Sequence, residues 1–203
     1  MRVKERDAVA AVADDGEIIA RSCLEPEQFA ALFDRHAAHI HRYAARRIGR
    51  EAADDLVAET FLAAFGKRWV YDRSHPDARP WLYGIATRLI GQHRRDELRQ
   101  YRIRRAAIPD PDLPGHAERV AADETARALR LQLSAALAAL PPDDRDLLIL
   151  IAWEQLTYEE AARALDIPVG TVRSRLSRAR IRIRAALAAS VPSEAIREIL
   201  SNE

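Results

Sequence analysis

Apolar residues recur three and four positions apart along most of this 203-residue chain, a spacing that predicts α-helices. The pattern becomes clear at Pro26, and we expect one helix to run from there to Gly49, a residue suited to ending a helix. Its expected inward face comprises Phe29, Leu32, Phe33, Ile40, Tyr43 and Ile48. The preceding residues 1–25 are polar and alanine-rich, so a mobile N-terminal extension or a weak helix is expected there.

Two further helices are expected in the N-terminal half. The stretch over 51–65 has an apolar face made of Leu56, Val57, Thr60, Phe61, Ala64 and Phe65. The acids of this stretch lie mostly in its first half, where carboxylates interact favourably with the helix dipole; they are Asp54, Asp55 and Glu59. After a loop or interrupted helix over 67–79, Pro80 opens a helix that continues toward Arg105.

A proline-rich stretch separates the two halves of the chain. Residues 106–123 contain three prolines and few large apolar groups, which is typical of an extended linker. Beyond the linker, a leucine-bearing helix is expected to stop at Pro141, and another helix is expected over 143–154. The pattern therefore predicts an all-α protein of two small helical domains joined by a flexible linker. The expected parts are 1–25 (extension), 26–105, 106–123 (linker), 124–188 and 189–203 (tail).

Residues 156–187 carry the signals of a helix-turn-helix. Thr157 followed by Glu160 is a capping box, in which a hydroxyl and a carboxylate satisfy backbone amides at a helix start. A tight turn at Asp166 is expected next, and Pro168 suits the first turn of a second helix because it lacks an amide hydrogen. The expected buried stripe of that second helix is Val172, Leu176, Ala179, Ile183 and Leu187.

The opposite face of the second helix carries hydroxyls and guanidiniums near its N-terminal end, where helix-turn-helix proteins reach base edges. These side chains are Thr171, Arg173, Ser174, Ser177 and Arg178. An arginine fork can bond both acceptors of guanine or bridge phosphates, and hydroxyls adapt to several base edges. The whole helix is strongly cationic, because it also carries Arg175, Arg180, Arg182 and Arg184. A solvated amphipathic helix is the alternative, but the combination of capped helix, tight turn and basic helix favours DNA binding.

The net charge of +1 does not suggest nucleic-acid binding, but the distribution of charge does. A second basic cluster lies at the far end of the helix that Pro80 opens and consists of Arg94, Arg95, Arg99, Arg102, Arg104 and Arg105. Tyr101 lies within it, and cations beside an aromatic side chain suit unpaired nucleic acid. For Trp81 and Tyr83, packing in the protein core is the alternative to contact with nucleic acid. For Trp81, core packing is the favoured interpretation.

Other features of the sequence limit the cell compartment and the chemistry expected of the protein. Cys23 is the only cysteine, which excludes an intramolecular disulfide and favours a reducing cytosol. No apolar run approaches the roughly 20 residues of a membrane span, and the N-terminus lacks a signal-peptide core, so a cytoplasmic protein is expected. The histidines at 36, 39 and 41 have no cysteine or carboxylate pattern that completes a metal site. We also expect no enzyme and no cofactor, since neither a phosphate-binding glycine loop nor a nucleophile elbow occurs.

Segments of both halves together resemble the extracytoplasmic-function (ECF) sigma factors of bacterial RNA polymerase. DDLVAETF at 54–61 and PWLYGIA at 80–86 resemble sigma region two, and GTVRSRLSRAR at 170–180 resembles region four. The likeness covers about residues 26–188 except the linker. Helix-turn-helix domains alone are common, whereas this combination of segments is specific.

The resemblance implies promoter-specific transcription initiation with DNA strand opening. Core RNA polymerase would be bound through its clamp helices by Asp54, Asp55, Leu56, Glu59 and Thr60. The promoter −10 element and the displaced strand would meet Trp81, Tyr83, Arg88, Gln92, His93, Arg94 and Arg95. The −35 element would be read by Arg173, Ser174, Ser177 and Arg178, supported by Thr171, and the same domain would touch the polymerase flap. An inhibitory anti-sigma factor is a further partner that the family implies and that no residue here identifies.

One position departs from the family, which often carries asparagine where this chain has Arg88, so the pocket for an extruded base is affected. A regulator that binds duplex DNA alone, through the helix-turn-helix only, is a competing interpretation. The N-terminal half argues against it, because that half shows no ligand pocket or phospho-acceptor arrangement. A nucleic-acid enzyme is a third interpretation, and it lacks an acid cluster for metal ions.

Overall fold

The computed structural model describes residues 13–107 and 124–190. All regular elements in these ranges are α-helices or short 3-10 turns, which confirms the all-α class. The chain divides into two compact units, Met1–Gln92 and His93–Glu203, so the division falls within one helix, α4 (Arg79–Ala107). The expected domain limits stay a prediction. The parts of the expected extension, linker and tail at 1–12, 108–123 and 191–203 lie outside the described residues.

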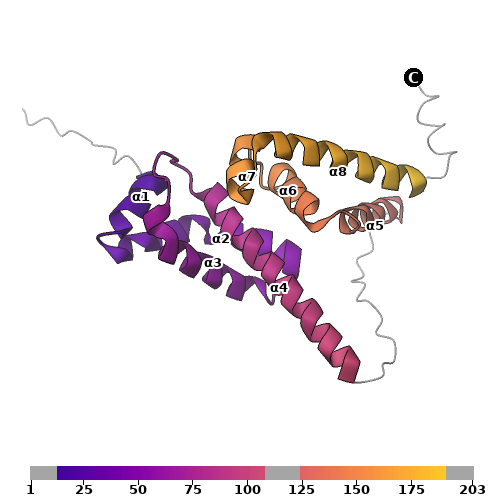
Figure 1. The fold of residues 1–203 in the computed structure, drawn as a ribbon, viewed down its shortest axis with the longest axis horizontal. Coiled ribbons are helices and arrows are strands. Elements are labelled where there is room, and N and C mark those ends of the chain that lie inside the picture. The colour runs from indigo at the N-terminus through magenta and orange to yellow at the C-terminus, as the bar shows by residue number, and fades with distance from the viewer. Residues whose placement is uncertain (1–12, 108–123, 191–203) are drawn as a thin grey trace, which may run out of the picture. The chain divides into compact units, whose positions relative to one another are not determined.

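The first unit contains α1 (Asp15–Ser22), α2 (Ala30–Ile48), α3 (Ala53–Lys67) and the start of α4, as Figure 1 shows. A 3-10 turn at Pro26–Phe29 leads into α2, and another at Arg68–Val70 follows α3. Gly49 ends α2 as predicted. Its φ of 85° suits glycine, and its amide donates to the carbonyl of Ala45 at 3.1 Å. The chain thereby turns between α2 and α3, which pack against each other.

Large side chains of α2 and α4 form the core of the first unit. Leu32, Ile40 and Leu82 are each 0% exposed. The rings of Tyr43 and Tyr83 meet edge to face, with centroids 5.2 Å apart, a preferred geometry for aromatic pairs. Full burial of one such side chain contributes about 1.5–3 kcal/mol, so these contacts hold α4 firmly against α2.

A chain of buried hydrogen bonds also joins α2 to α4. Arg47 Nη1 donates to the Tyr43 hydroxyl at 3.2 Å, and the Tyr43 and Thr87 hydroxyls lie 2.7 Å apart. The Thr87 hydroxyl donates to the carbonyl of Tyr83 at 2.7 Å. Buried polar groups are costly unless they are paired. The Tyr43–Thr87 bond, which crosses between the helices, therefore favours this packing of α4 on α2.

Helix α1 (Asp15–Ser22) lies within residues 1–25, where a mobile extension or a weak helix was expected, and it agrees with the second alternative. Ile18 and Ile19 of this helix are 6% and 0% exposed, so it belongs to the packed first unit. At Gly16 an added Cβ would lie only 3.0 Å from the carbonyl oxygen of Arg73, which shows how closely α1 approaches the backbone before α4. With only two large apolar residues, this short helix gave a weak periodic signal.

Asp15 fastens α1 to two segments that are distant in sequence. Its Oδ2 accepts from the amide of Ala78 at 2.8 Å and lies 2.7 Å from His36 Nε2, and Arg35 pairs with Oδ1. Burial alone would raise the pKa of Asp15, but the bonds to His36, Ala78 and Arg35 outweigh it and hold the pKa below its usual value. His36 is only 5% exposed, whereas His39 and His41 of the same helix are half-buried.

The second unit contains α5 (Glu124–Ala138), α6 (Pro142–Ala152), α7 (Tyr158–Leu165) and α8 (Val169–Ser190). Helix α6 begins at Pro142, one position before the expected start at residue 143, and proline suits this first position because it lacks an amide hydrogen. Helices α5, α6 and α7 all pack against α8. The α8 stripe is confirmed in part, since Val172, Leu176 and Ala179 are at most 1% exposed, whereas Ile183 and Leu187 are half-buried.

The predicted corner between α7 and α8 is present. The Thr157 hydroxyl accepts from the amide of Glu160 at 3.2 Å, and the Thr157 amide donates to the Glu160 carboxylate at 2.7 Å. Asp166 ends α7 in the left-handed conformation, with φ 55° and ψ 50°. The carbonyl of Pro168 then accepts from the amide of Thr171 at 2.8 Å and starts α8. The two helices therefore form the bihelical unit that the sequence predicts.

Candidate functional site

The outer face of α8 presents the side chains that the sequence singles out. Arg173, Ser174, Ser177 and Arg178 are exposed, and Thr171 is half-buried. The Ser174 hydroxyl donates to the carbonyl of Thr171 at 3.1 Å, which leaves its oxygen able to accept. These groups lie opposite the buried stripe, so hydroxyls and guanidiniums face outward together. DNA contact by them stays a prediction.

Two arginines of α8 are held by acids of another helix. Arg175 Nη1 lies 3.2 Å from Asp143 Oδ2, and Arg182 Nη1 lies 3.1 Å from Asp144 Oδ2. Both acids occupy the first turn of α6. Sequence reasoning missed these pairs because the acids lie 32 and 38 positions away from their arginines.

In the first half of α4, the residues predicted to contact the −10 element fall into two groups that differ in burial. Arg88 and Gln92 are exposed, whereas Tyr83 is 1% exposed and lies in the core. Trp81 is half-buried, with its ring centroid 4.9 Å from that of Tyr71. Direct contact of Tyr83 with DNA is therefore incompatible with this packing, and core packing, the alternative reading of Tyr83, describes it correctly.

The far end of α4 is more open. Arg95 is exposed, Arg94 and His93 are half-buried, and His93 Nε2 lies 3.3 Å from Glu97 one turn on. Tyr101 is 51% exposed, so an aromatic face stands beside the basic side chains. The side chains of the last arginines in this run, at positions 102, 104 and 105, lie outside the described residues.

Helix α3 likewise divides its predicted contacts by burial. Asp54, Asp55 and Glu59 are exposed. Leu56 is 4% and Thr60 0% exposed, and the Thr60 hydroxyl donates to the carbonyl of Leu56 at 2.7 Å. The two buried residues cannot touch a partner in this packing, so they support the acidic face from beneath.

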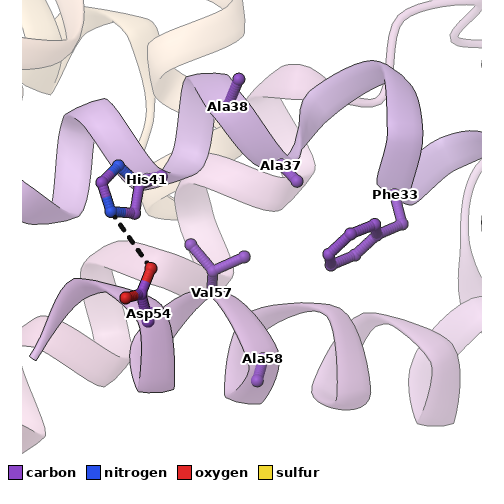
Figure 2. A pocket seen from close by; sticks show the side chains of 7 residues that line it. All are labelled: Phe33, Ala37, Ala38, His41, Asp54, Val57 and Ala58. Atoms are coloured by element: carbon purple, nitrogen blue, oxygen red, sulfur yellow. Dashed lines mark ion pairs between the residues drawn. The ribbon is translucent and has the colours of Figure 1, made fainter.

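A shallow apolar groove lies between α2 and α3 beside these acids. Figure 2 shows the side chains that line it, which are Phe33, Ala37, Ala38, His41, Asp54, Val57 and Ala58. Its volume is about 300 Å³, and His41 Nε2 pairs with Asp54 Oδ1 at 3.3 Å across one end. Phe33 was expected to face inward, but it remains 43% exposed in the groove. Sequence periodicity cannot reveal such a groove, because two separate helices form it.

One cluster has a spacing compatible with a metal ion. Asp15, His36 and Asp77 each place one ligand atom within 4.8 Å of the others. Each carboxylate already carries an arginine, since Arg35 pairs with Asp15 and Arg79 lies 2.8 Å from Asp77 Oδ2. Burial alone would raise the pKa of Asp77, but the bonds from Arg79 hold it below its usual value. A cation would face two guanidiniums there, so we interpret the cluster as a structural joint.

Comparison with known proteins gives the class of the chain. The models for "Sigma-70 region 2" and "Sigma-70, region 4" match residues 32–100 and 130–183. Two solved structures share the fold. CnrH, in complex with the cytosolic domain of CnrY, has a TM-score of 0.59 and 24% identity over 87% of this chain and 99% of its own. RpoE of Bartonella quintana, in complex with NepR, has a TM-score of 0.57 and 23% identity over 80% and 98%.

Curated relatives identify the group of sigma factors to which the chain is similar. The ECF sigma factor SigL of Mycobacterium tuberculosis is 36% identical over 72% of this chain and 81% of its own length. The sigma factor NccH of Alcaligenes xylosoxydans xylosoxydans is 30% identical over 86% and 95%. The match to SigE of Mycolicibacterium smegmatis, 35% identical over 77% of this chain, spans only 60% of that protein. The chain belongs to the ECF RNA polymerase sigma factors. Among its described helices, none is both long and apolar enough to span a membrane.

Proposed function

We propose that this chain directs promoter-specific initiation as a subunit of RNA polymerase and carries out no catalysis itself. The observation that carries the proposal is the outward hydroxyl and guanidinium face of α8 in a chain that also matches sigma region 2. A helix-turn-helix alone serves many regulators. The region that matches sigma region 2 adds an exposed basic surface on α4, which supports a protein that both selects DNA and helps to open it.

In this proposal α8 reads the −35 element. Arg173 and Arg178 supply bidentate donors, and Ser174 and Ser177 supply adaptable hydroxyls, with Thr171 in support. Each good bidentate base contact discriminates by about 1–3 kcal/mol, which is enough to choose a site but does not separate strands. Strand separation therefore requires a second surface.

That second surface is the exposed side of α4, which meets the −10 element. Arg88, Gln92 and Arg95 project from it, with Trp81, His93 and Arg94 partly exposed beside them, and Tyr83 supports it from within. Extruding a base costs a few kcal/mol, so the surface must return that free energy by stacking and phosphate contacts. Arg88 puts a cation where relatives often carry an amide, which favours a phosphate contact at that position.

Core polymerase binding is assigned to the surface of α3 and its groove. Exposed Asp54, Asp55 and Glu59 border an apolar hollow, a combination that fits a helical partner with basic and apolar side chains. Leu56 and Thr60 hold that surface in shape. The structures of CnrH and RpoE contain CnrY and the anti-sigma factor NepR, so an anti-sigma partner is included in the proposal, with no residue assigned to it.

The test adds the purified full chain to core polymerase and sequences the transcripts made from a promoter library. We expect transcripts to start downstream of a shared pair of −35 and −10 sequences, and only when both components are present. The control is the chain alone, for which weak duplex binding is expected. Tight sequence-specific duplex binding by the chain alone, without promoter-specific transcripts, would favour a free-standing regulator instead.

A further inference from the structure

Two acids of α6 restrain part of the cationic surface of α8. Arg175 reaches Asp143, and Arg182 reaches Asp144, at 3.2 and 3.1 Å. The Asp144 side chain is only 9% exposed, so its carboxylate depends on Arg182 for a counter-charge. Arg175 is 24% exposed, far less than an arginine that extends into solvent. Both guanidiniums are thus directed toward α6.

The restrained arginines alternate with the predicted DNA contacts along α8. Thr171, Arg175, Arg178 and Arg182 are spaced four, three and four residues apart, so they form one row on the helix surface. Arg175 is the neighbour of both Thr171 and Arg178, and Arg182 follows Arg178 after one turn. The two ion pairs lie about 10 Å apart along the helix axis, since each residue adds roughly 1.5 Å.

A guanidinium released from this row would be close enough to DNA to touch phosphates. A bound duplex that meets Thr171 and Arg178 passes beside both restrained side chains. Phosphate contacts strengthen binding to every sequence alike, whereas base contacts distinguish sequences. Additional free arginines on this face would therefore raise non-specific affinity more than specific affinity.

We propose that Asp143 and Asp144 are positioning residues that withhold Arg175 and Arg182 from DNA and thereby raise the sequence discrimination of α8. The proposal rests on the proposed function in one respect, that α8 is the helix that meets DNA. The two acids orient other side chains and touch no base themselves. Their removal leaves α8 able to grip any duplex through a larger set of cations.

A purely structural role for these acids makes a different prediction. Asp143 and Asp144 also lie in the first turn of α6, where carboxylates stabilise a helix. If that were their only role, substitution would lower the stability of the second unit and leave the salt dependence of DNA binding unchanged. The slope of log affinity against log salt separates the two roles, because it counts the phosphates that the protein neutralises.

The experiment measures binding of the full chain to a random-sequence duplex across a potassium chloride series by fluorescence anisotropy. Asp143→Asn, Asp144→Asn and the double variant are compared with the unaltered chain. We expect the slope to steepen by about 0.9 for each arginine that reaches a phosphate. Adding Arg175→Gln and Arg182→Gln to the double variant should restore the original slope. With core polymerase, the double variant should show a lower ratio of promoter to random-duplex binding.

The matched control is Glu159→Gln, which removes one negative charge from an exposed acid in the first turn of α7. Its slope should equal that of the unaltered chain. An unchanged slope in the double variant, or a steeper slope that persists without Arg175 and Arg182, would overturn the proposal. If Asp144→Asn unfolds the second unit, Asp143→Asn alone carries the test, since that carboxylate is 71% exposed. Random-duplex slopes need no promoter activity, so failure of the promoter-library experiment leaves this result interpretable.

Discussion

The two basic helices, α4 and α8, are held in their units by different forces. Helix α4 is fixed by buried, directional bonds, in which Tyr43 and Thr87 meet at 2.7 Å and Tyr83 packs edge to face on Tyr43. Helix α8 rests on an apolar stripe that includes Leu176, with ion pairs to α6 along one edge. The first arrangement resists salt, because its polar contacts are buried, whereas exposed ion pairs are screened.

Because of this difference, the two helices should respond differently to changes in charged side chains and in salt concentration. The rotation of α4 is set inside the first unit, so its exposed cations can change without altering how the helix sits. The side chains of α8 are set partly at the surface by ion pairs, so ionic conditions and single charge changes should alter which of its guanidiniums are held against α6. Four predictions test the contrast, starting with the largest expected effect.

Tyr83→Ala should disrupt the packing of α4 against α2. Truncating a large buried aromatic side chain typically costs about 3–5 kcal/mol, because contacts are lost and a cavity remains. Urea denaturation followed by circular dichroism should show a destabilised first unit. Tyr83→Phe is the control, since it keeps the ring contact with Tyr43. Unchanged stability together with lost −10 binding would mean that Tyr83 meets DNA directly.

Asp15→Asn should loosen α1 and change how the first unit responds to acid. Losing hydrogen bonds to a buried charge costs about 1–3 kcal/mol. The folded-state pKa of Asp15 lies below its usual value of about 3.9, so its contribution to stability is present above that pH and is lost as pH falls through the lower folded pKa. Acid titration of stability should therefore be flatter in the variant below about pH 4. Identical acid profiles for the two proteins would contradict this role.

Arg173→Ala and Arg178→Ala should each weaken −35 selection by about 1–3 kcal/mol while core polymerase affinity stays the same. The measurement is competition between promoter and mutated −35 duplexes for the reconstituted polymerase. Arg184→Ala is the control, because it removes an exposed cation farther from the N-terminal end of α8. Equal losses of polymerase binding in the two test variants would count against the assigned role.

Arg94→Ala combined with Arg95→Ala should slow strand opening about fivefold, the effect of roughly 1 kcal/mol. Initial promoter binding should change less, because these side chains are assigned to the separated strand. Permanganate reactivity of unpaired thymines measures the open complex. Arg50→Ala serves as the control, because it removes an exposed cation outside α4. If the double variant reaches full permanganate reactivity at the normal rate, these arginines do not contribute to strand opening.

Local sequence signals were sufficient for the second unit. The Thr157–Glu160 capping box, the turn at Asp166 and the spacing of Val172 and Leu176 each involve residues a few positions apart, so the corner could be predicted. The end of α2 was predicted for the same reason, because Gly49 follows it directly. Backbone capping and helical periodicity act over one or two helical turns, so both can be recognised in the amino-acid sequence alone.

What sequence reasoning missed depends on contacts between distant residues. Asp15 is bonded to His36 and Ala78, which lie 21 and 63 positions away, so neither the burial of α1 nor that of His36 was apparent. The acids opposite Arg175 and Arg182 are 32 and 38 positions away. Periodicity did list Leu56 and Thr60 as apolar-face positions. The family resemblance then assigned them to a partner, and their burial favours the periodic interpretation.

The left-handed backbone at Asp166 has a consequence for redesign. A β-branched residue would be strained at φ 55°, and relief of that strain would tilt α8 as a rigid rod and misdirect all its outward groups at once. Single replacements on α8 leave that angle intact. If α8 reads DNA as proposed, a different target sequence should be sought by varying positions 173, 174, 177 and 178, with aspartate, asparagine or glycine kept at position 166.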